Sequence, residues 1–303
     1  DSMLGDVLGL DLCPAAAQIT KDHAVNYMLG AVRYSDRLTT VSPSYAMEIC
    51  TPEYGEGLEG VYNERKNILS GIVNGIDYDI WNPETDPSLW YKYNADSLEL
   101  KRKNKEEFQK ELGLEVNADI PLFGIVSRLT EQKGFDLVAA DMPTFMDRNM
   151  QIVILGVGEY GFEEAFKWYS STYPQKVSAN ITFSNDLSHK IYGCADAFIM
   201  PSRFEPCGLS QIMSMRYGTL PVVRLTGGLK DTVIPYNYVT GEGTGFGFDR
   251  YDADDLRASV DYALNVWYND KDAWDNMVKQ AMSTDFTWYK SAEEYRKLYR
   301  GLV

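Results

Sequence analysis

The sequence contains few residues of the kinds that build metal sites and disulfide frameworks. Its 303 residues include only two histidines, His23 and His189, which lie far apart. A histidine-rich metal site is therefore not expected. The four cysteines form no Cys-x-x-Cys pair, which predicts neither a zinc site nor a disulfide framework and favours a reducing compartment. These cysteines are Cys13, Cys50, Cys194 and Cys207.

Basic residues and long apolar runs are also scarce. Lysine and arginine number 29 against 44 acidic residues, which gives a formal net charge of -15. This balance argues against a general binder of nucleic acid or anionic membranes, whose surface is basic. One local basic pocket for an anionic small molecule stays possible. Apolar runs such as 151–155 are far too short to span a bilayer.

What the sequence does contain is enough apolar material for a packed core, with 45% hydrophobic residues in one large domain or two modest ones. In the first quarter, apolar residues spaced 3-4-3 predict a helix over 25–32, and Thr39–Val41 suits a short strand. Ser42-Pro43 is typical of a helix start. A strand is expected within 68–73.

Residues 77–93 are rich in Pro, Asn, Asp and Trp and show neither helical nor strand periodicity, so we expect an ordered connection there. A charged amphipathic helix is expected over 101–112. From Pro121 on, apolar strand-like runs alternate with helical patterns, which predicts an α/β fold with a doubly wound parallel sheet. The expected strands are 122–126, 152–155, 181–183, 197–200 and 220–223, and the expected helices are 135–146, 159–169, 188–193, 209–217 and 256–267.

Open α/β sheets bind ligands at the carboxyl ends of their strands, and unusual residues follow four of the expected strands. After the first come Arg128 and Lys133, five residues apart, with Gly134 opening the next helix. Two cations at a helix start suit a phosphate, although the same spacing also fits two solvated surface cations. After the second strand, Gly156 and Gly158 allow close approach of a ligand or simply form a turn.

The other two loops are 201–210 and 225–232. In the first, Glu205 precedes the amides of Gly208 and Leu209 and the Ser210 hydroxyl. These groups could bind an anion or the hydroxyls of a sugar, or they could simply cap the helix that follows. Cys207 has no flanking base and is not expected to be a nucleophile. In the second loop, Thr226, Gly227 and Gly228 form either an amide nest or a plain turn. A single phosphate or nucleotide ligand accounts for all four loops together.

In combination, these motifs resemble those of bacterial glycogen synthases and plant starch synthases, which are retaining glycosyltransferases of the GT-B fold. The resemblance runs from about Val25 to Val303 and is most specific over 201–232. The motifs that carry it are 39–43, 74–77, 81–83, 127–134, 201–209 and 226–229.

The resemblance implies three regions: the tail of an N-terminal, acceptor-side lobe over 1–75, a complete C-terminal nucleotide-sugar-binding lobe over 76–285, and a helix over 286–303 that crosses back to the first lobe. The family's Lys-x-Gly-Gly-Leu loop, which opens its first lobe, is not found in this sequence. We therefore expect a fragment that carries the donor-binding half.

The resemblance also implies roles for individual residues. Arg128 and Lys133 would grip the diphosphate of ADP-glucose, and Glu205 would contact hydroxyls of the donor sugar, which makes these three the expected catalytic residues. Phe183 would stack on adenine. The expected donor-binding set also includes Gly156, Cys207, Gly208, Leu209, Ser210, Thr226, Gly227 and Gly228.

The implied reaction moves glucose from ADP-glucose to the non-reducing end of an α-1,4-glucan, with retention of the anomeric configuration and with no cofactor or metal. Nucleic acid and membranes are not expected partners, and the bacterial cytoplasm or the plastid stroma is the expected compartment. Two alternatives stay open: a transferase of the same fold that uses a UDP-sugar, and a nucleotide-binding fragment without turnover.

Overall fold

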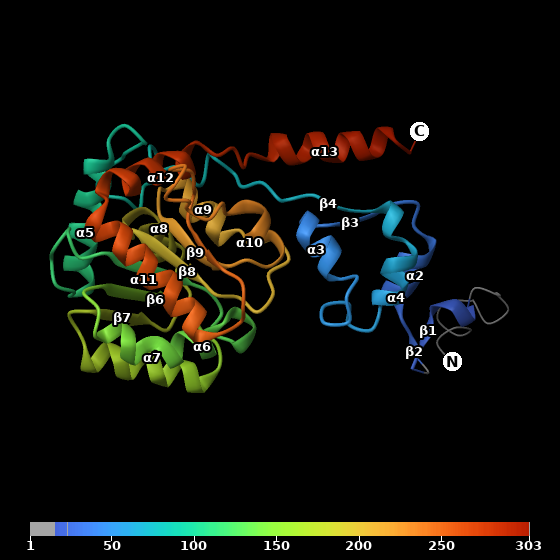
Figure 1. Cartoon of the computed structure of the whole chain (residues 1–303), viewed down its shortest axis with the longest axis horizontal. Coiled ribbons are helices and arrows are strands. Elements are labelled where there is room, and N and C mark those ends of the chain that lie inside the picture. Colours follow the sequence, from blue (N-terminus) through green and yellow to red (C-terminus); the bar gives the residue numbers. More distant parts are fainter. Residues whose placement is uncertain (1–15, 23, 303) are drawn as a thin grey trace.

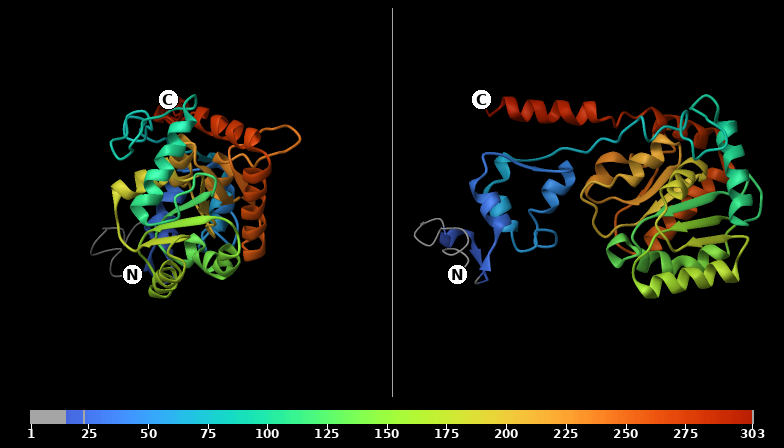
Figure 2. Two further views of the ribbon diagram at one scale, coloured as in Figure 1. Left: turned by 90° about the vertical axis from the view of Figure 1, so that its left-hand side faces the viewer. Right: turned by 180° about the vertical axis from the view of Figure 1, so that it is seen from behind.

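The computed structural model describes residues 16–22 and 24–302, so Cys13 and His23 lie outside the described residues. It contains a larger α/β part built on a six-stranded sheet and a smaller part near the N-terminus (Figure 1). Figure 2, seen from behind, shows the extended segment after the smaller part and the C-terminal helix running together between the two parts.

The six strands of the large sheet are all parallel, in the order β10-β9-β8-β5-β6-β7. The chain moves outward from β5 in one direction and then returns to continue from β8 in the other, so the connections diverge between β5 and β8. This is the doubly wound arrangement that the sequence predicted. The strands are β5 (Leu122–Val126), β6 (Gln151–Leu155), β7 (Val177–Asn180), β8 (Ala197–Met200), β9 (Leu220–Arg224) and β10 (Phe246–Phe248).

Helices cover both faces of this sheet, which explains why its central strands are apolar throughout rather than alternating. On one face α6 (Phe135–Met146) packs against α7 (Tyr160–Thr172) and α11 (Ala253–Asn269). On the other, α8 contacts α5 and α9, and α12 packs on α9. The bounds of these four are α5 (Leu98–Leu112), α8 (Asn185–Cys194), α9 (Ser210–Arg216) and α12 (Lys271–Ser283).

The expected strand at 181–183 is wrong. The edge strand of the sheet is β7, which pairs Val177 with Ile152 and ends at Asn180. Ile181 to Phe183 lie in the loop beyond it, and the Phe183 side chain is 83% exposed. The β-branched and aromatic residues that suggested a strand thus belong to the loop that follows one.

The smaller part holds a pair of parallel strands, β3 (Leu38–Thr40) and β4 (Leu69–Gly71). The predicted helix start is confirmed, because Ser42 accepts a hydrogen bond from the amide of Tyr45 at 3.0 Å and Pro43 opens α3 (Pro43–Glu48). The remaining elements are β1 (Thr20–Lys21), β2 (Ala24–Val25), α2 (Tyr27–Tyr34), α4 (Glu59–Glu64) and the 3-10 turns η1 (Ala16–Ile19) and η2 (Lys66–Ile68).

The segment 77–93 is an ordered connection, as expected, and packs against the large part. Its buried Asp86 accepts hydrogen bonds from Tyr217 Oη and, at 2.7 Å, from His189 Nδ1. Trp81 stacks on the His189 ring with centroids 4.1 Å apart. Burial alone would raise the pKa of Asp86, but the hydrogen bonds from His189, Tyr217 and the Ser88 amide outweigh it and leave this pKa below its usual value.

The C-terminal helix α13 (Trp288–Arg300) returns to the extended segment that links the two parts. The Ile76 amide donates to the Phe286 carbonyl at 2.9 Å, and Ser291 Oγ donates to the Val73 carbonyl at 2.7 Å. The helix therefore begins beside the segment that links the two parts.

Candidate active site

The sheet carries a cavity of about 220 Å³ at the point where its connections diverge. The ends of β5 and β8 and the loops that follow them form its walls, as expected for a ligand site of an open α/β sheet. Arg128, Lys133, Ser202 and Ser210 contribute polar groups to its lining.

Lys133, which lines this cavity, pairs with Glu205 although the two are 72 residues apart. The Lys133 ammonium lies 2.5 Å from Glu205 Oε2, and Ser202 Oγ donates to the same oxygen at 3.2 Å. Glu205 is only 6% exposed. Two of the three predicted catalytic side chains are therefore in contact, and the buried carboxylate keeps the lysine amine beside it.

Gly134 explains how Lys133 is brought there. This residue ends the 3-10 turn η3 (Glu131–Lys133) with φ at +79°, a conformation that glycine adopts without steric cost. A Cβ at this position would lie 2.2 Å from the Pro201 carbonyl oxygen. The loops after β5 and β8 can thus approach each other only with glycine at 134.

Arg128 is the other cation of the cavity. Its side chain is exposed, and across residues 16–22 and 24–302 it forms no ion pair and no side-chain hydrogen bond. An unpaired guanidinium at the mouth of a cavity is available to a phosphate, which it can bind through two parallel hydrogen bonds.

A second cavity of about 260 Å³ shares Val126, Ser127 and Arg128 with the first. Gly156 and Phe183 line it, so these two predicted donor-binding residues lie together beside the cation. The exposed ring of Phe183 offers a stacking face for a base, and Gly156 has no side chain that would obstruct it.

The loop 201–210 brings one further predicted residue to the first cavity, whereas Cys207, Gly208 and Leu209 are not part of its lining. Ser210 lines it directly, whereas Leu209 is 40% exposed. The buried Gln211 side chain donates to the carbonyls of Cys207 and Gly208 at 3.1 and 3.0 Å and so fixes the turn. Burial raises the pKa of the Cys207 thiol, which fits the expectation that it is not a nucleophile.

The loop 226–228 lies against Glu205. The Gly228 amide donates to the Glu205 carbonyl at 2.9 Å, and a Cβ on Gly228 would come within 2.0 Å of the Cys207 carbonyl oxygen. The Gly227 amide, however, does not face an open space. It donates at 2.8 Å to Glu48 Oε1, a carboxylate of the smaller part that no sequence motif singles out.

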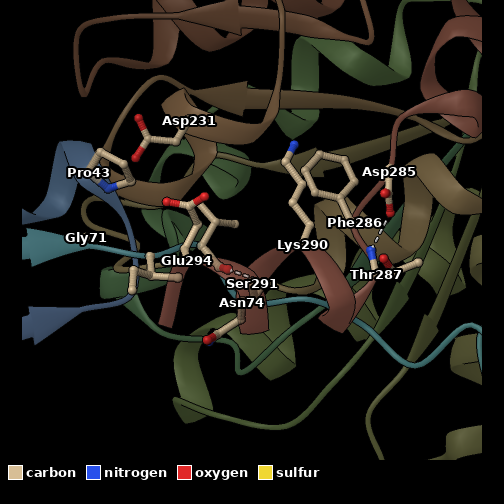
Figure 3. A pocket seen from close by; sticks show the side chains of 12 residues that line it. Pro43, Gly71, Asn74, Asp231, Asp285, Phe286, Thr287, Lys290, Ser291 and Glu294 are labelled. Carbon is tan, nitrogen blue, oxygen red and sulfur yellow. Dashed lines mark hydrogen bonds between the residues drawn. The ribbon is translucent and has the colours of Figure 1, made fainter. Parts of the chain in front are cut away.

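A third cavity, of about 250 Å³, lies between the smaller part, α10 (Gly227–Thr232) and α13. Figure 3 shows Asp231 and Pro43 at one side of it and Lys290 and Phe286 at another. It shares no lining residue with the two cavities that contain Arg128. Within the described part of the chain, no group of three or more His, Cys, Asp or Glu side chains could hold a metal ion, and no described helix is long and apolar enough to cross a membrane.

The parallel sheet and the cavity at its divergence point define a doubly wound α/β protein with a ligand site at the carboxyl ends of its strands. Residues 104–281 match the family described as "Glycosyl transferases group 1", and residues 2–64 match the one described as "Starch synthase catalytic domain". The chain belongs to the group 1 glycosyl transferases, which confirms the predicted fold class.

Individual relatives support the resemblance to glycogen and starch synthases. The chain is 50% identical over its full length to a glycogen synthase of Streptococcus mutans, and 53% identical over 91% of its length to one of Lachnospira eligens. It spans 64% and 58% of the length of these two relatives.

Two solved structures are similar in fold to this chain. The catalytic domain of starch synthase IV from Arabidopsis thaliana, bound to ADP and acarbose, superposes with a TM-score of 0.87 at 36% identity, covering 93% of this chain and 59% of that one. A sucrose-phosphate synthase from Thermosynechococcus elongatus, with a TM-score of 0.60 at 20% identity and coverage of 91% and 61%, shares the fold.

Proposed function

We propose that this chain carries the donor-binding half of a retaining glucosyltransferase that moves glucose from ADP-glucose to the non-reducing end of an α-1,4-glucan. The observation that carries the proposal is that Arg128 and Lys133 line one cavity at the divergence point of the sheet, with Glu205 paired to Lys133. The similarity to glycogen synthases, and to a starch synthase bound to ADP and acarbose, supports this choice of donor and acceptor.

The two cations act on the leaving group. As the bond from the anomeric carbon to the diphosphate breaks, negative charge grows on the departing phosphate, and Arg128 and Lys133 stabilise that charge. A cation about 4 Å from a unit charge interacts by roughly 4 kcal/mol at an effective dielectric constant of 20. Losing half of this in the transition state costs about 30-fold in rate.

The remaining residues orient the donor. Glu205 accepts hydrogen bonds from hydroxyls of the donor glucose, and the backbone of Cys207, Gly208 and Leu209 lines the sugar. The retaining reaction then takes place on one face of the sugar, and the departing phosphate accepts the proton of the acceptor hydroxyl. Phe183 stacks on adenine in the neighbouring cavity, which places the diphosphate beside Arg128.

Calorimetric titration with ADP and with UDP tests the choice of donor. The chain is expected to bind ADP, weakly but more tightly than UDP. Equal or tighter binding of UDP would favour a UDP-sugar transferase, and binding of neither nucleotide would refute a nucleotide-sugar site.

Transfer of labelled glucose from ADP-glucose to glycogen is measured on the same sample. We expect the 303-residue chain to bind ADP without measurable transfer, because the donor half alone does not place the acceptor. Incorporation of label would show that this chain carries the complete reaction.

A further inference from the structure

Two carboxylates join the smaller and larger parts in a reciprocal way. Glu48, at the end of α3, accepts from the Gly227 amide at 2.8 Å and from Thr226 Oγ1 at 3.0 Å. Asp231, on α10, accepts from the Ser44 amide at 2.8 Å and from Ser44 Oγ at 2.6 Å. Helices α3 and α10, which face each other in Figure 1, thus hold each other by one acidic residue apiece.

The Glu48 contact reaches the candidate active site through the backbone. Gly227 is followed by Gly228, whose amide donates to the Glu205 carbonyl at 2.9 Å. The Glu205 side chain in turn holds Lys133. A continuous series of short contacts therefore connects the smaller part to the cation that faces the first cavity.

The geometry of Glu48 suits this task. Both of its donors converge on Oε1, while Oε2 is buried with no hydrogen-bond partner among the described residues. A buried carboxylate oxygen without a partner is costly. Glu48 keeps this position because its other oxygen orders two groups of the loop at once.

We propose that Glu48 is a positioning residue that sets the 226–228 loop, and through it Glu205, when the two parts are together, and that Glu48 and Asp231 form the latch between the parts. The effect on donor binding rests on the proposed function. The latch itself does not, because its four hydrogen bonds belong to the protein alone.

Removal of the side chain separates the two ends of the latch from their donors. Both donors on Glu48 use the same oxygen, so Glu48→Gln retains an acceptor for both, whereas Glu48→Ala loses both. Asp231→Ala loses both bonds to Ser44. Glu53→Ala, at an exposed glutamate of the same part, is the matched control.

Hydrogen exchange at the Gly227 and Gly228 amides and calorimetric ADP affinity are measured on the full chain, with thermal unfolding as a check of folding. Glu48→Ala is expected to speed exchange at both amides and to weaken ADP binding roughly tenfold. Glu48→Gln is expected to stay close to the unmodified protein, and Asp231→Ala to speed the same exchange from the opposite side. Glu53→Ala is expected to change neither measurement.

Unchanged exchange in Glu48→Ala, or equal damage by Glu48→Ala and Glu48→Gln, would overturn the proposal. If the unmodified chain binds no ADP, the proposed function fails, and the exchange rates still decide whether the latch exists. If Glu48→Ala does not fold, Asp231→Ala and Glu48→Gln decide the same question.

Discussion

At the scale of single residues, Phe183 offers the clearest separation between base binding and phosphate binding. Its ring is 83% exposed and lines the second cavity, so it contributes little to the core. Stacking of an aromatic side chain on a base is worth about 1–3 kcal/mol. Phe183→Ala is therefore expected to weaken ADP and adenosine by a similar factor of about ten or more, measured by calorimetry.

Folding of this variant is expected to be unchanged in urea unfolding, because no core contact is lost. The exposed Trp168 on α7 provides a matched aromatic control, and Trp168→Ala should leave both affinities as they are. A Phe183→Ala protein that binds adenosine normally would remove Phe183 from the base site.

Single residues also show where sequence reasoning ends. The position of Arg128, Lys133 and Glu205 at one edge of the sheet could be predicted, because each follows a buried strand and parallel strands end at one edge, whereas their roles are implied only by the resemblance to a known family. Glu48 could not, because nothing in its own helix distinguishes it from a surface glutamate. Its role depends on which face of α3 meets α10, and that is a property of the packed parts.

At the scale of elements, the connection 77–93 depends on the buried Asp86 and its donors Tyr217 and His189. Replacing Asp86 by Asn removes the charge that these hydrogen bonds stabilise. Because a buried donor then loses a charged acceptor, Asp86→Asn is expected to destabilise the fold at pH 7 by about 1–3 kcal/mol. Urea unfolding measures this difference.

The pH dependence follows from the lowered pKa of Asp86. A carboxyl whose pKa is lower in the folded protein contributes stability above its unfolded pKa, near about 4, and loses it as the pH falls through the folded value. The gap between the unmodified protein and Asp86→Asn should shrink as the pH falls below about 4. Asp96→Asn, at an exposed aspartate, is the control. A stability difference that persists at the lowest pH, or one that Asp96→Asn reproduces, would contradict this account.

The elements of the sheet differ in how far the sequence predicts them. β5 and β6 are continuous apolar runs buried on both faces, and their positions are predicted to within a residue. β7 carries the polar residues Ser178 and Asn180 at the edge of the sheet. The more apolar segment 181–183 therefore predicts the strand a few residues too late. β10 is only three residues long and is a strand because it pairs with β9, and no local sequence pattern predicts this pairing.

At the scale of the whole molecule, the charge at the first cavity has the opposite sign to the net charge of the chain. The chain carries a net charge of -15, yet Arg128 and Lys133 face one cavity at the edge of the sheet. A neutral glucan, the proposed acceptor, needs no basic surface, whereas the diphosphate of the proposed donor needs local positive charge. Composition predicts the net negative charge, and the spacing of the two cations in one loop predicts the local positive charge.

The most direct test of this placement compares ADP with adenosine in the unmodified chain and in Lys133→Ala. The dissociation constant of adenosine divided by that of ADP isolates the contribution of the diphosphate. Removing a cation that binds the diphosphate is expected to reduce this ratio about tenfold or more, which corresponds to about 1.4 kcal/mol. Lys167→Ala, at an exposed lysine of α7, is the control. A ratio that stays the same in Lys133→Ala would contradict the claim that this edge of the sheet holds the leaving nucleotide.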